Sequence, residues 1–317
     1  MGMGSEINVR SVPTSDQEKL NVCELSVCIV TYQARDWLRR CLESLYQNTQ
    51  LSPIEVIIVD NGSVDGVHEM LEQEFPRASF IGNDSNRGYT RPMNQALQEA
   101  QGRYLLQLNP DTVILPEALD RLVHFMGEHP QAGICGPKVL NPDDSLQKQC
   151  RRGEPRPLAV ISYFLGLSKL FPNNKQFGEY LLEYVDEDQT VKVAAVSGSC
   201  MLIRREVVDQ IGYLDEYFYA YQEDTDYCTR ARKAGWEVFY VADSQIIHYG
   251  GKGGSRVEPF RSIVEWHRSY LIYYRKHLAR DYFFLFNWFF YFMMILKLSV
   301  SLIINLFRRE RYAGPKR

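Results

Sequence analysis

Short apolar runs rich in β-branched residues alternate with segments of helical spacing over the first third of the chain, and this alternation constrains the fold most strongly. The strand-like runs lie at 25–30, 55–59, 78–81 and 104–108, and the helix-like segments at 36–48, 67–74 and 94–100. Strands that alternate with helices form a mostly parallel, doubly wound sheet of nucleotide-binding type. We therefore expect an α/β fold, in which ligands bind beyond the carboxyl ends of the strands.

Polar clusters follow three of these strands. They are Thr31-Tyr32, Asp60-Asn61 and Asn109-Pro110-Asp111. An Asp at a strand end can bind Mg²⁺ or Mn²⁺ that also holds a diphosphate, because hard cations prefer oxygen ligands. Asn-Pro-Asp is also good turn chemistry, so the tripeptide alone leaves both interpretations open.

Three carboxylates lie within the four residues from Glu223 to Asp226, directly after an aromatic run. Adjacent carboxylates repel each other and apolar surroundings raise a pKa, so one of them could act as a general base. The alternative is an acidic first turn of a helix over 226–234, which the helix dipole favours. Both hold if Asp226 caps the helix and Asp224 is catalytic.

His248 ends an apolar run and precedes a glycine-rich loop at 250–255. Imidazole is a frequent metal ligand, although a lone His is more often structural. The loop could fold over phosphates, with Lys252 or Arg256 compensating charge, or it could be a plain connection.

Composition narrows the class of protein. The 317 residues are 45% hydrophobic and 24% charged, which is typical of a globular core, and the net charge of −3 gives no sign of a nucleic-acid partner. Seven scattered cysteines without a Cys-x-x-Cys pair predict neither a disulfide framework nor a structural zinc site. We expect a loose extension over 1–24, a main domain over 25–280 and an apolar tail over 281–317. The main domain would have a donor half near 25–115, an irregular middle over 141–189 and an acceptor half near 190–280.

From Leu25 to His277 the chain resembles the family 2 glycosyltransferases of GT-A fold, especially the rhamnosyltransferase-like branch that builds bacterial surface polysaccharides. Each matching segment is weak alone, but their order along the chain is specific. The segments are 26–32, 56–63, 86–89 with Asn94, 108–111, 196–205, 211–216, 223–228 and 248–251.

The resemblance implies a binding site for a dTDP-, UDP- or GDP-linked sugar. Thr31, Tyr32 and Asp60 would line the nucleotide base pocket, with Asp60 accepting a hydrogen bond from a pyrimidine imide. Arg87 and Asn94 would lie near the base or the phosphates.

The resemblance also implies a metal site. Asn109-Pro110-Asp111 stands where the family has Asp-x-Asp, so Asn109 would contact the donor and Asp111 would bind Mn²⁺ or Mg²⁺. His248 would be a second metal ligand.

For the reaction, the resemblance implies that Asp224 deprotonates the acceptor hydroxyl and Glu223 helps to position the acceptor. A single catalytic carboxylate, without a second one as nucleophile, indicates displacement with inversion by a hexosyltransferase. The alternative is a catalytically silent subunit that binds sugar nucleotides or acts as a scaffold in a membrane polysaccharide complex. A dehydrogenase fits less well, because residues 31–37 lack a Gly-x-Gly-x-x-Gly fingerprint.

The segment from Tyr282 to Phe307 is strongly apolar, and Lys297 is its only charge. A helix of this length could cross a hydrocarbon core of about 30 Å. Lys297, Ser301 and Asn305 share one helical face, which suits a helix lying in the membrane interface or one spanning with its polar stripe against protein. A buried core or dimer helix is the alternative, and a homo-oligomer stays open.

Basic residues follow this segment, with Arg308, Arg309 and Arg311 first. Positive charge beside an apolar segment is typical of the cytoplasmic side of a membrane. We therefore expect monotopic attachment through 282–317 to the cytoplasmic face of the inner membrane, with a lipid-linked saccharide as acceptor.

Overall fold

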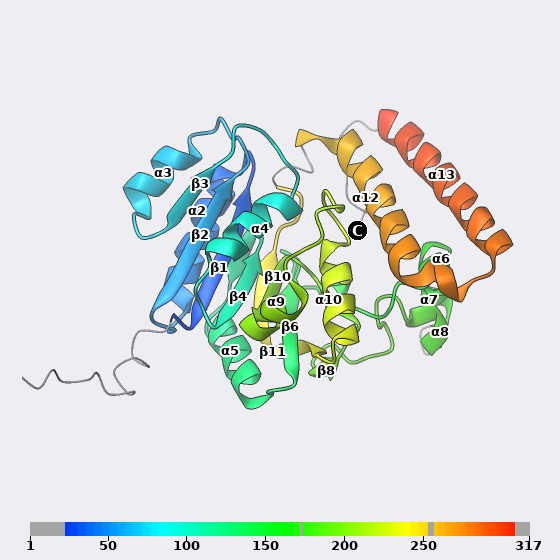
Figure 1. Ribbon diagram of the computed structural model, residues 1–317, viewed down its shortest axis with the longest axis horizontal. Coiled ribbons are helices and arrows are strands. Elements are labelled where there is room, and N and C mark those ends of the chain that lie inside the picture. The colour runs from blue at the N-terminus through cyan, green and yellow to red at the C-terminus, as the bar shows by residue number, and fades with distance from the viewer. Residues whose placement is uncertain (1–22, 172–173, 253–256, 308–317) are drawn as a thin grey trace, which may run out of the picture.

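The computed structural model describes residues 23–171, 174–252 and 257–307 (Figure 1), so almost all of the predicted extension over 1–24 lies outside the described residues. Within the described residues, nine strands form one sheet in the order β3-β2-β1-β4-β10-β6-β11-β5, with β8 paired to β11. The strands are β1 Leu25–Thr31, β2 Ile54–Asp60, β3 Ser79–Gly82, β4 Tyr104–Leu108, β5 Thr112–Ile114, β6 Ala132–Leu140, β8 Val191–Lys192, β10 Cys200–Arg204 and β11 Glu237–His248.

The sheet is mixed, and its parallel part is the one predicted from the alternation. Strands β1 to β4 run parallel, β10 runs antiparallel between β4 and β6, and β11 runs parallel to β6. All seven residues of β1 are buried, as expected for a strand covered on both faces. Thr31 pairs with Asp60 in register, so the ends of β1 and β2 are level at one edge of the sheet.

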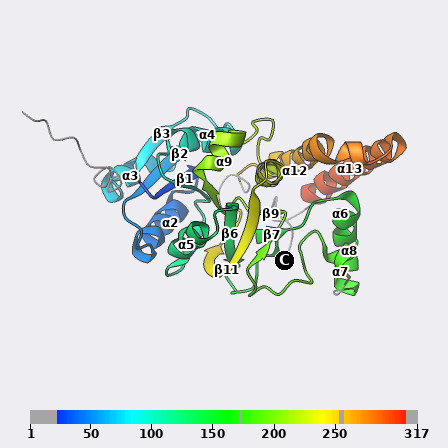
Figure 2. The ribbon, with the colours of Figure 1, turned by 60° about the horizontal axis from the view of Figure 1, so that its bottom comes forward.

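Helices cover both faces of this sheet. Figure 2 shows α2 and α5 on one side and α4 and α9 on the other. The helices are α2 Arg35–Asn48, α3 Val67–Glu74, α4 Thr90–Glu99, α5 Ala118–Glu128, α9 Arg205–Ile211 and α10 Glu223–Lys233. The expected α/β fold, with a doubly wound and mostly parallel sheet, is confirmed. The seven cysteines all lie in the described part of the chain and are free thiols.

Helix α4 runs from Thr90 to Glu99 and contains residues 94–99 of the segment expected to be helical, so Asn94 lies inside the helix. One helix start differs from the prediction. Helix α10 begins at Glu223 rather than Asp226, and Gln222 precedes it in the left-handed conformation, with φ of 62°. The prediction that Asp226 caps this helix is therefore wrong, because Asp226 lies in its first turn.

The middle of the chain is more ordered than predicted. It contains α6 Pro157–Phe164, α7 Leu167–Leu170 and α8 Lys175–Gly178. The two-residue strand β7 Arg151–Arg152 pairs with β9 Ala195–Val196 and brings the middle segment onto the main domain.

The C-terminal part is a pair of packed helices, α12 Pro259–Tyr273 and α13 Phe284–Leu306. A short π-helical turn, η3 Tyr274–Leu278, and a 3₁₀ turn, η4 Ala279–Asp281, join them. Phe290 and Met294 of α13 pack with Tyr270 and Tyr274 in a second hydrophobic cluster, separate from the core of the sheet.

The polar stripe predicted on the apolar tail faces protein. The Nζ of Lys297 lies 3.1 Å from the Nε2 of His267 on α12. The amide of Asn287 donates to the carbonyl of Ala279 at 3.0 Å and accepts from the hydroxyl of Tyr274. The opposite, apolar face of α13 is exposed, with only 17% of its most apolar window buried, so α13 is not a core helix.

Candidate active site

A cavity of about 430 Å³ lies at the carboxyl ends of the central strands. Thr31 and Tyr32 line it after β1, and Asn109 to Asp111 line it after β4. Its other walls are residues 197–199, residues 219–224, His248 and the start of α12. Residues 197–199 reach the cavity because they precede the antiparallel strand β10. Its first residue, Cys200, pairs with Leu108 at the end of β4.

Asp111 and His248 meet at one end of the cavity, although 137 residues separate them. The pairing of β11 with β5 places His248 opposite Thr112, next to Asp111. The Nε2 of His248 lies 3.1 Å from Oδ1 of Asp111 and 3.3 Å from the amide nitrogen of Asn109. Oε1 of Gln147 accepts a hydrogen bond from Nδ1 of the same ring at 2.7 Å, which fixes the ring orientation.

The carboxylate of Asp111 is buried yet stays suited to a cation. Burial raises its pKa, but the nearby His248 and hydrogen bonds from His248 and the backbone NH of Lys252 outweigh this effect and lower the pKa. The Lys252 NH lies 3.1 Å from Oδ2 of Asp111.

These residues fit a divalent cation that a substrate also holds. Among the described residues, no group of three or more His, Cys, Asp and Glu side chains converges into an all-protein metal cage. Mg²⁺-type sites commonly use one or two carboxylates together with substrate phosphates. One carboxylate and one imidazole, with oxygens of a diphosphate, would complete such a site.

Asp224 is held by four hydrogen bonds. Its Oδ2 accepts from Arg152 at 2.7 Å and from the NH of Gly198 at 2.9 Å. Its Oδ1 accepts from the NH and the hydroxyl of Thr225 at 2.6 and 3.1 Å. Because Arg152 is also buried, Asp224 neutralises a buried cation and fixes the backbone near Gly198.

Glu223 has a different environment. It lines the cavity, and its Oε2 has no hydrogen-bond partner among the described residues. Burial, followed by the charge of Asp224, raises the pKa of Glu223 to about 8. A carboxyl group with one unbonded oxygen and a pKa near neutral is suited to proton transfer.

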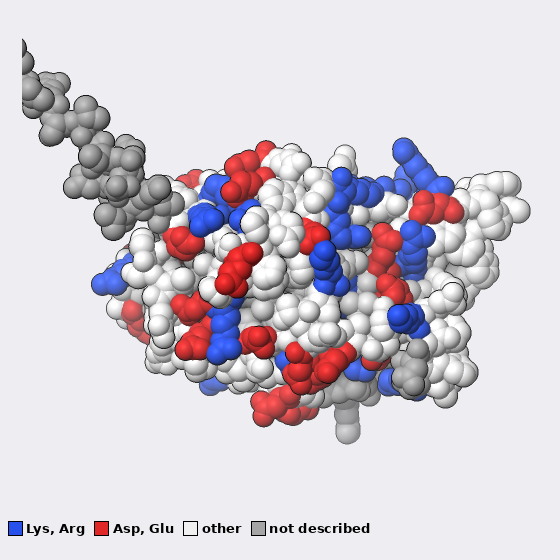
Figure 3. Space-filling view, turned by 90° about the horizontal axis from the view of Figure 1, so that it is seen from below, with Lys and Arg blue, Asp and Glu red and all other residues white. Residues whose placement is uncertain are grey.

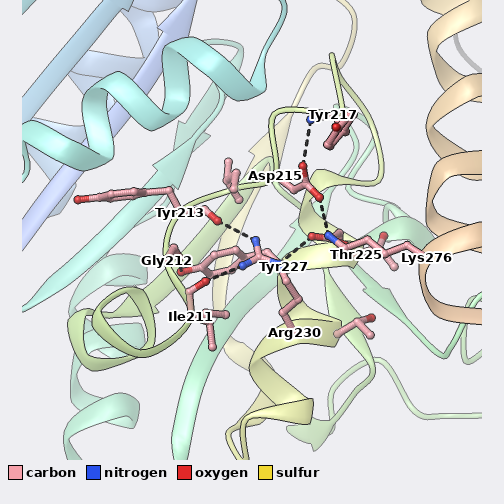
Figure 4. A network of polar contacts seen from close by, with 12 residues as sticks. Ile211, Gly212, Tyr213, Asp215, Tyr217, Thr225, Tyr227, Arg230 and Lys276 are labelled. Atoms are coloured by element: carbon pink, nitrogen blue, oxygen red, sulfur yellow. Dashed lines mark hydrogen bonds and ion pairs between the residues drawn. The ribbon is translucent and has the colours of Figure 1, made fainter.

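Asp226 belongs to a structural network outside the cavity lining, part of which Figure 4 shows. Arg230 donates to Oδ2 of Asp226 at 2.9 Å and to the carbonyls of Ile211 and Tyr213. His277 and Lys276 each approach Oδ1 of Asp226 at 2.7 Å. The network joins α10 to the loop before it and to η3, and it thereby holds Glu223 in place.

This network predicts a pH-dependent stability. Burial raises the pKa of Asp226, but hydrogen bonds and charges from His277, Lys276 and Arg230 lower it overall from 3.8 to about 2. Because the pKa is lower in the folded than in the unfolded chain, the ionised carboxylate stabilises the fold by about 2 kcal/mol when the pH is above the unfolded-state pKa. This contribution is lost as the pH falls from about 4 to about 2. We expect the difference in unfolding free energy between the wild type and Asp226→Asn to shrink over that range in urea titrations. A difference that is constant from pH 6 to pH 2 would contradict the assignment.

The predicted donor residues do not all reach the cavity. Thr31 and Tyr32 line it, whereas Asp60, Arg87 and Asn94 are not part of its lining. Both carboxylate oxygens of Asp60 accept from Ser63, at 2.5 and 2.9 Å. The Arg87 side chain is exposed.

Asn94 is a structural residue in this arrangement. Its amide donates to the carbonyl of Leu214 at 2.9 Å and accepts from the NH of Leu214 at 3.0 Å. It therefore joins α4 to the loop before α10.

Several cavity residues were not predicted as site residues. Asn61 lies next to Asp60, and its amide donates to Asn86 and to the carbonyl of Gly88 at 3.0 and 2.6 Å. Gly88 lies so close to Tyr219 that a Cβ would meet its carbonyl oxygen at 2.5 Å. Arg152 also lines the cavity, and no sequence pattern assigns it a role. The same is true of Gln147, which lies outside the lining but bonds to His248.

The chain matches the model of "Glycosyl transferase family 2" over residues 26–212, and a second model, "Glycosyl transferase family group 2", over residues 180–308. It is 30% identical over 260 residues to the N-acetylglucosaminyl-diphospho-decaprenol L-rhamnosyltransferase of Mycobacterium tuberculosis, covering 78% of this chain and 83% of that one. It is 27% identical over 229 residues to the low-salt glycan biosynthesis hexosyltransferase Agl10 of Haloferax volcanii, covering 71% and 66%. The chain belongs to glycosyltransferase family 2. It is a glycosyltransferase that uses a nucleotide sugar donor.

Solved structures agree on the fold. The mannosyltransferase PcManGT from Pyrobaculum calidifontis, in complex with GDP-Man and Mn²⁺, is similar with a TM-score of 0.55 at 16% identity. The S. aureus TarS 1–349 structure with UDP-GlcNAc is similar with a TM-score of 0.55 at 17% identity. The aligned parts cover 80% and 78% of this chain, but only 64% and 65% of those two chains.

Proposed function

We propose that this glycosyltransferase transfers a hexose with inversion to a hydroxyl of a lipid-linked saccharide, in the synthesis of a cell-surface polysaccharide. One observation carries the proposal: a single cavity has the Asp111–His248 pair at one place and, at another, the carboxyl of Glu223, whose Oε2 has no hydrogen-bond partner among the described residues. Rhamnose is the first sugar to test, because the mycobacterial relative is named as an L-rhamnosyltransferase that acts on a diphospho-decaprenol substrate. The presence of both groups also favours an enzyme over a catalytically silent subunit.

Asp111 and His248 would hold Mn²⁺ or Mg²⁺ together with the donor diphosphate. A cation bound there would neutralise charge that develops on the leaving nucleoside diphosphate. Asn109 would donate its amide hydrogens toward the same phosphate oxygens. Thr31 and Tyr32 would contact the nucleoside, and Asp60 and Arg87 would reach it only after a side-chain rearrangement.

The acceptor hydroxyl would lose its proton to Glu223. This assignment exchanges the two roles expected from the sequence, because Asp224 is committed to Arg152, Gly198 and Thr225 while Oε2 of Glu223 is unbonded. Asp224 would act as a positioning residue that anchors α10 and neutralises Arg152. Two further described carboxylates line the cavity, Glu258 and Glu265, and they pair with Arg261 and Arg268 at 3.0 and 2.9 Å. Because neither is as free as Glu223 to attack the sugar, the reaction would be a single displacement with inversion.

Donor identity is testable by mass action, since a ligand that binds only the folded state raises its stability. We expect one of the dTDP-, UDP- and GDP-sugars to raise the melting temperature in the presence of Mn²⁺ and much less in EDTA. Thermal unfolding of the full chain with each donor, with and without metal, gives the answer. Stabilisation that is equal in EDTA would argue against a metal-linked donor site.

The tail would attach the enzyme to a membrane without crossing it. Helix α13 packs along α12 from Phe290, which contacts Tyr270, to Lys297, which contacts His267. Helix α12 carries Arg261, Glu265 and Arg268, and charges of this kind are costly in hydrocarbon. A spanning α13 would draw α12 to the same depth, so an interfacial position is favoured.

The basic residues after α13 would then meet anionic headgroups at the cytoplasmic face. Fractionation of cells that express the full chain tests the attachment. Recovery of the whole enzyme in the soluble fraction, without detergent, would contradict it.

A further inference from the structure

A second exposed apolar surface lies on α6 and α7, in the segment that the sequence suggested would be irregular. Leu165 and Leu170 are 68% and 70% exposed, and Leu158, Phe164 and Phe171 are also exposed. We call this surface, formed by exposed apolar side chains of residues 158–171, the α6–α7 surface. Apolar side chains that gather in this way usually mark an interaction site.

The charge of this segment is of one sign. Between Glu154 and Glu179 the charged residues are Arg156, Lys169 and Lys175, all basic. Arg156 is paired with Glu154 and Asp281. The other two basic residues are Lys169 on α7 and Lys175 on α8. Glu183 lies beside Ser168 and Lys169 of α7, but its side chain is only 11% exposed and pairs with Lys148 at 2.6 Å. An apolar face bordered by lysines is complementary to an anionic lipid surface.

The α6–α7 surface adjoins α13. The Nζ of Lys297 on α13 lies 4.5 Å from the centroid of the Phe164 ring on α6. Val160 of α6 belongs to the same hydrophobic cluster as Phe290 and Met294. Figures 1 and 2 both place α6, α7 and α13 at one end of the molecule, and Figure 3 shows the outermost part of that end without charged side chains.

We propose that the α6–α7 surface is a second membrane contact, covered by an anionic bilayer together with the exposed face of α13. The inference rests on the proposed attachment through α13 and adds a second point of contact. One helix lying in an interface can rotate about its own axis, whereas two contacts from different parts of the chain fix the orientation of the domain on the membrane.

The consequence concerns the acceptor. Trp266 lines the cavity, and its ring packs against Phe164 with centroids 6.1 Å apart. The part of the cavity that Trp266 lines therefore lies next to the α6–α7 surface, and it would receive the acceptor. A saccharide on a lipid carrier would enter the cavity while its lipid stays in the bilayer.

The test is binding of the full-length enzyme to vesicles of phosphatidylcholine that contain phosphatidylglycerol. We expect the double variant Leu165→Asp/Leu170→Asp to lower the partition coefficient by about tenfold, because it removes apolar area and adds repulsion at the proposed contact. The control is Val64→Asp, which places one such charge at an apolar position that is 89% exposed and lies near the end of β2. Leu165→Asp alone, which adds the same single charge at the α6–α7 surface, is compared with it directly. The control is expected to bind the vesicles like the wild type.

Donor-induced thermal stabilisation of each variant confirms that the catalytic domain is folded. If the aspartate pair fails that check, Leu165→Ser/Leu170→Ser replaces it, and a smaller loss of binding is expected. The inference is overturned if the wild type binds vesicles and the folded double variant binds them equally well. It is also overturned if the variant dissociates an oligomer and leaves vesicle binding unchanged, since the surface would then cover a second copy of the chain. A wild type that does not bind vesicles at all would refute the proposed α13 attachment instead.

Discussion

Replacing Glu223 by glutamine is expected to lower the turnover number by about 10²–10⁴-fold, the usual contribution of a general base, while donor affinity stays near the wild-type value. Glutamine keeps the size of the side chain but cannot accept the proton of the acceptor hydroxyl. Initial rates of sugar transfer at saturating donor and acceptor, with donor-induced thermal stabilisation as the binding control, measure both quantities.

The pH profile separates this role from a structural one. The active form of the base is ionised, so kcat/KM should rise with pH as a carboxyl group with a pKa of about 8 loses its proton. That rise should be absent from the residual activity of Glu223→Gln.

Asp224→Asn provides the comparison. It leaves Arg152 buried without its charged partner, so it should reduce stability as well as activity. Near-normal turnover of Glu223→Gln, together with an inactive but fully stable Asp224→Asn, would return the role of base to Asp224.

Replacing Asp111 by alanine is expected to lower the apparent affinity for Mn²⁺ in the presence of donor by at least about 100-fold. Loss of residues that merely orient metal ligands costs about 10–100-fold, and loss of a ligand should cost no less. His248→Ala should have an effect in the same direction. The measurement is a Mn²⁺ titration of donor-induced thermal stabilisation.

The matched control for the imidazole is His124→Ala, since His124 is an exposed histidine on α5 that pairs with Glu128 at 3.3 Å. It should titrate like the wild type. Wild-type titration curves for both Asp111→Ala and His248→Ala would show that the metal site lies elsewhere or does not exist.

The parallel half of the sheet could be predicted because its signals are local. Each strand from β1 to β4 is a short apolar run, and the polar residues that follow it fall at the ligand-binding edge by a general rule of such sheets. Thr31 and Asn109 to Asp111 were placed correctly at the cavity for this reason. The same rule placed Asp60 at the strand end, but it could not show that Ser63 would occupy both oxygens of that carboxylate.

The contacts between distant segments could not be derived from local patterns. Asp111 meets His248 because β11 pairs with β5, and only the family resemblance suggested that the two residues act together. Arg152 reaches Asp224 through the pairing of two-residue strands, which are too short to leave a periodic signal. The start of α10 was misplaced because Gln222 enters the helix through a left-handed conformation without a side-chain cap, so no capping residue marks the boundary.

The central claim is that one cavity binds the metal-linked donor and activates the acceptor hydroxyl for inverting transfer. The most direct test is NMR analysis of the product formed from the stabilising nucleotide sugar and a short-chain lipid-linked saccharide, with Mn²⁺ and with EDTA. We predict a new glycosidic bond whose anomeric configuration is opposite to that of the donor, formed only when metal is present and lost in Glu223→Gln. A product with retained configuration, or transfer that continues at the same rate in EDTA, would contradict the account.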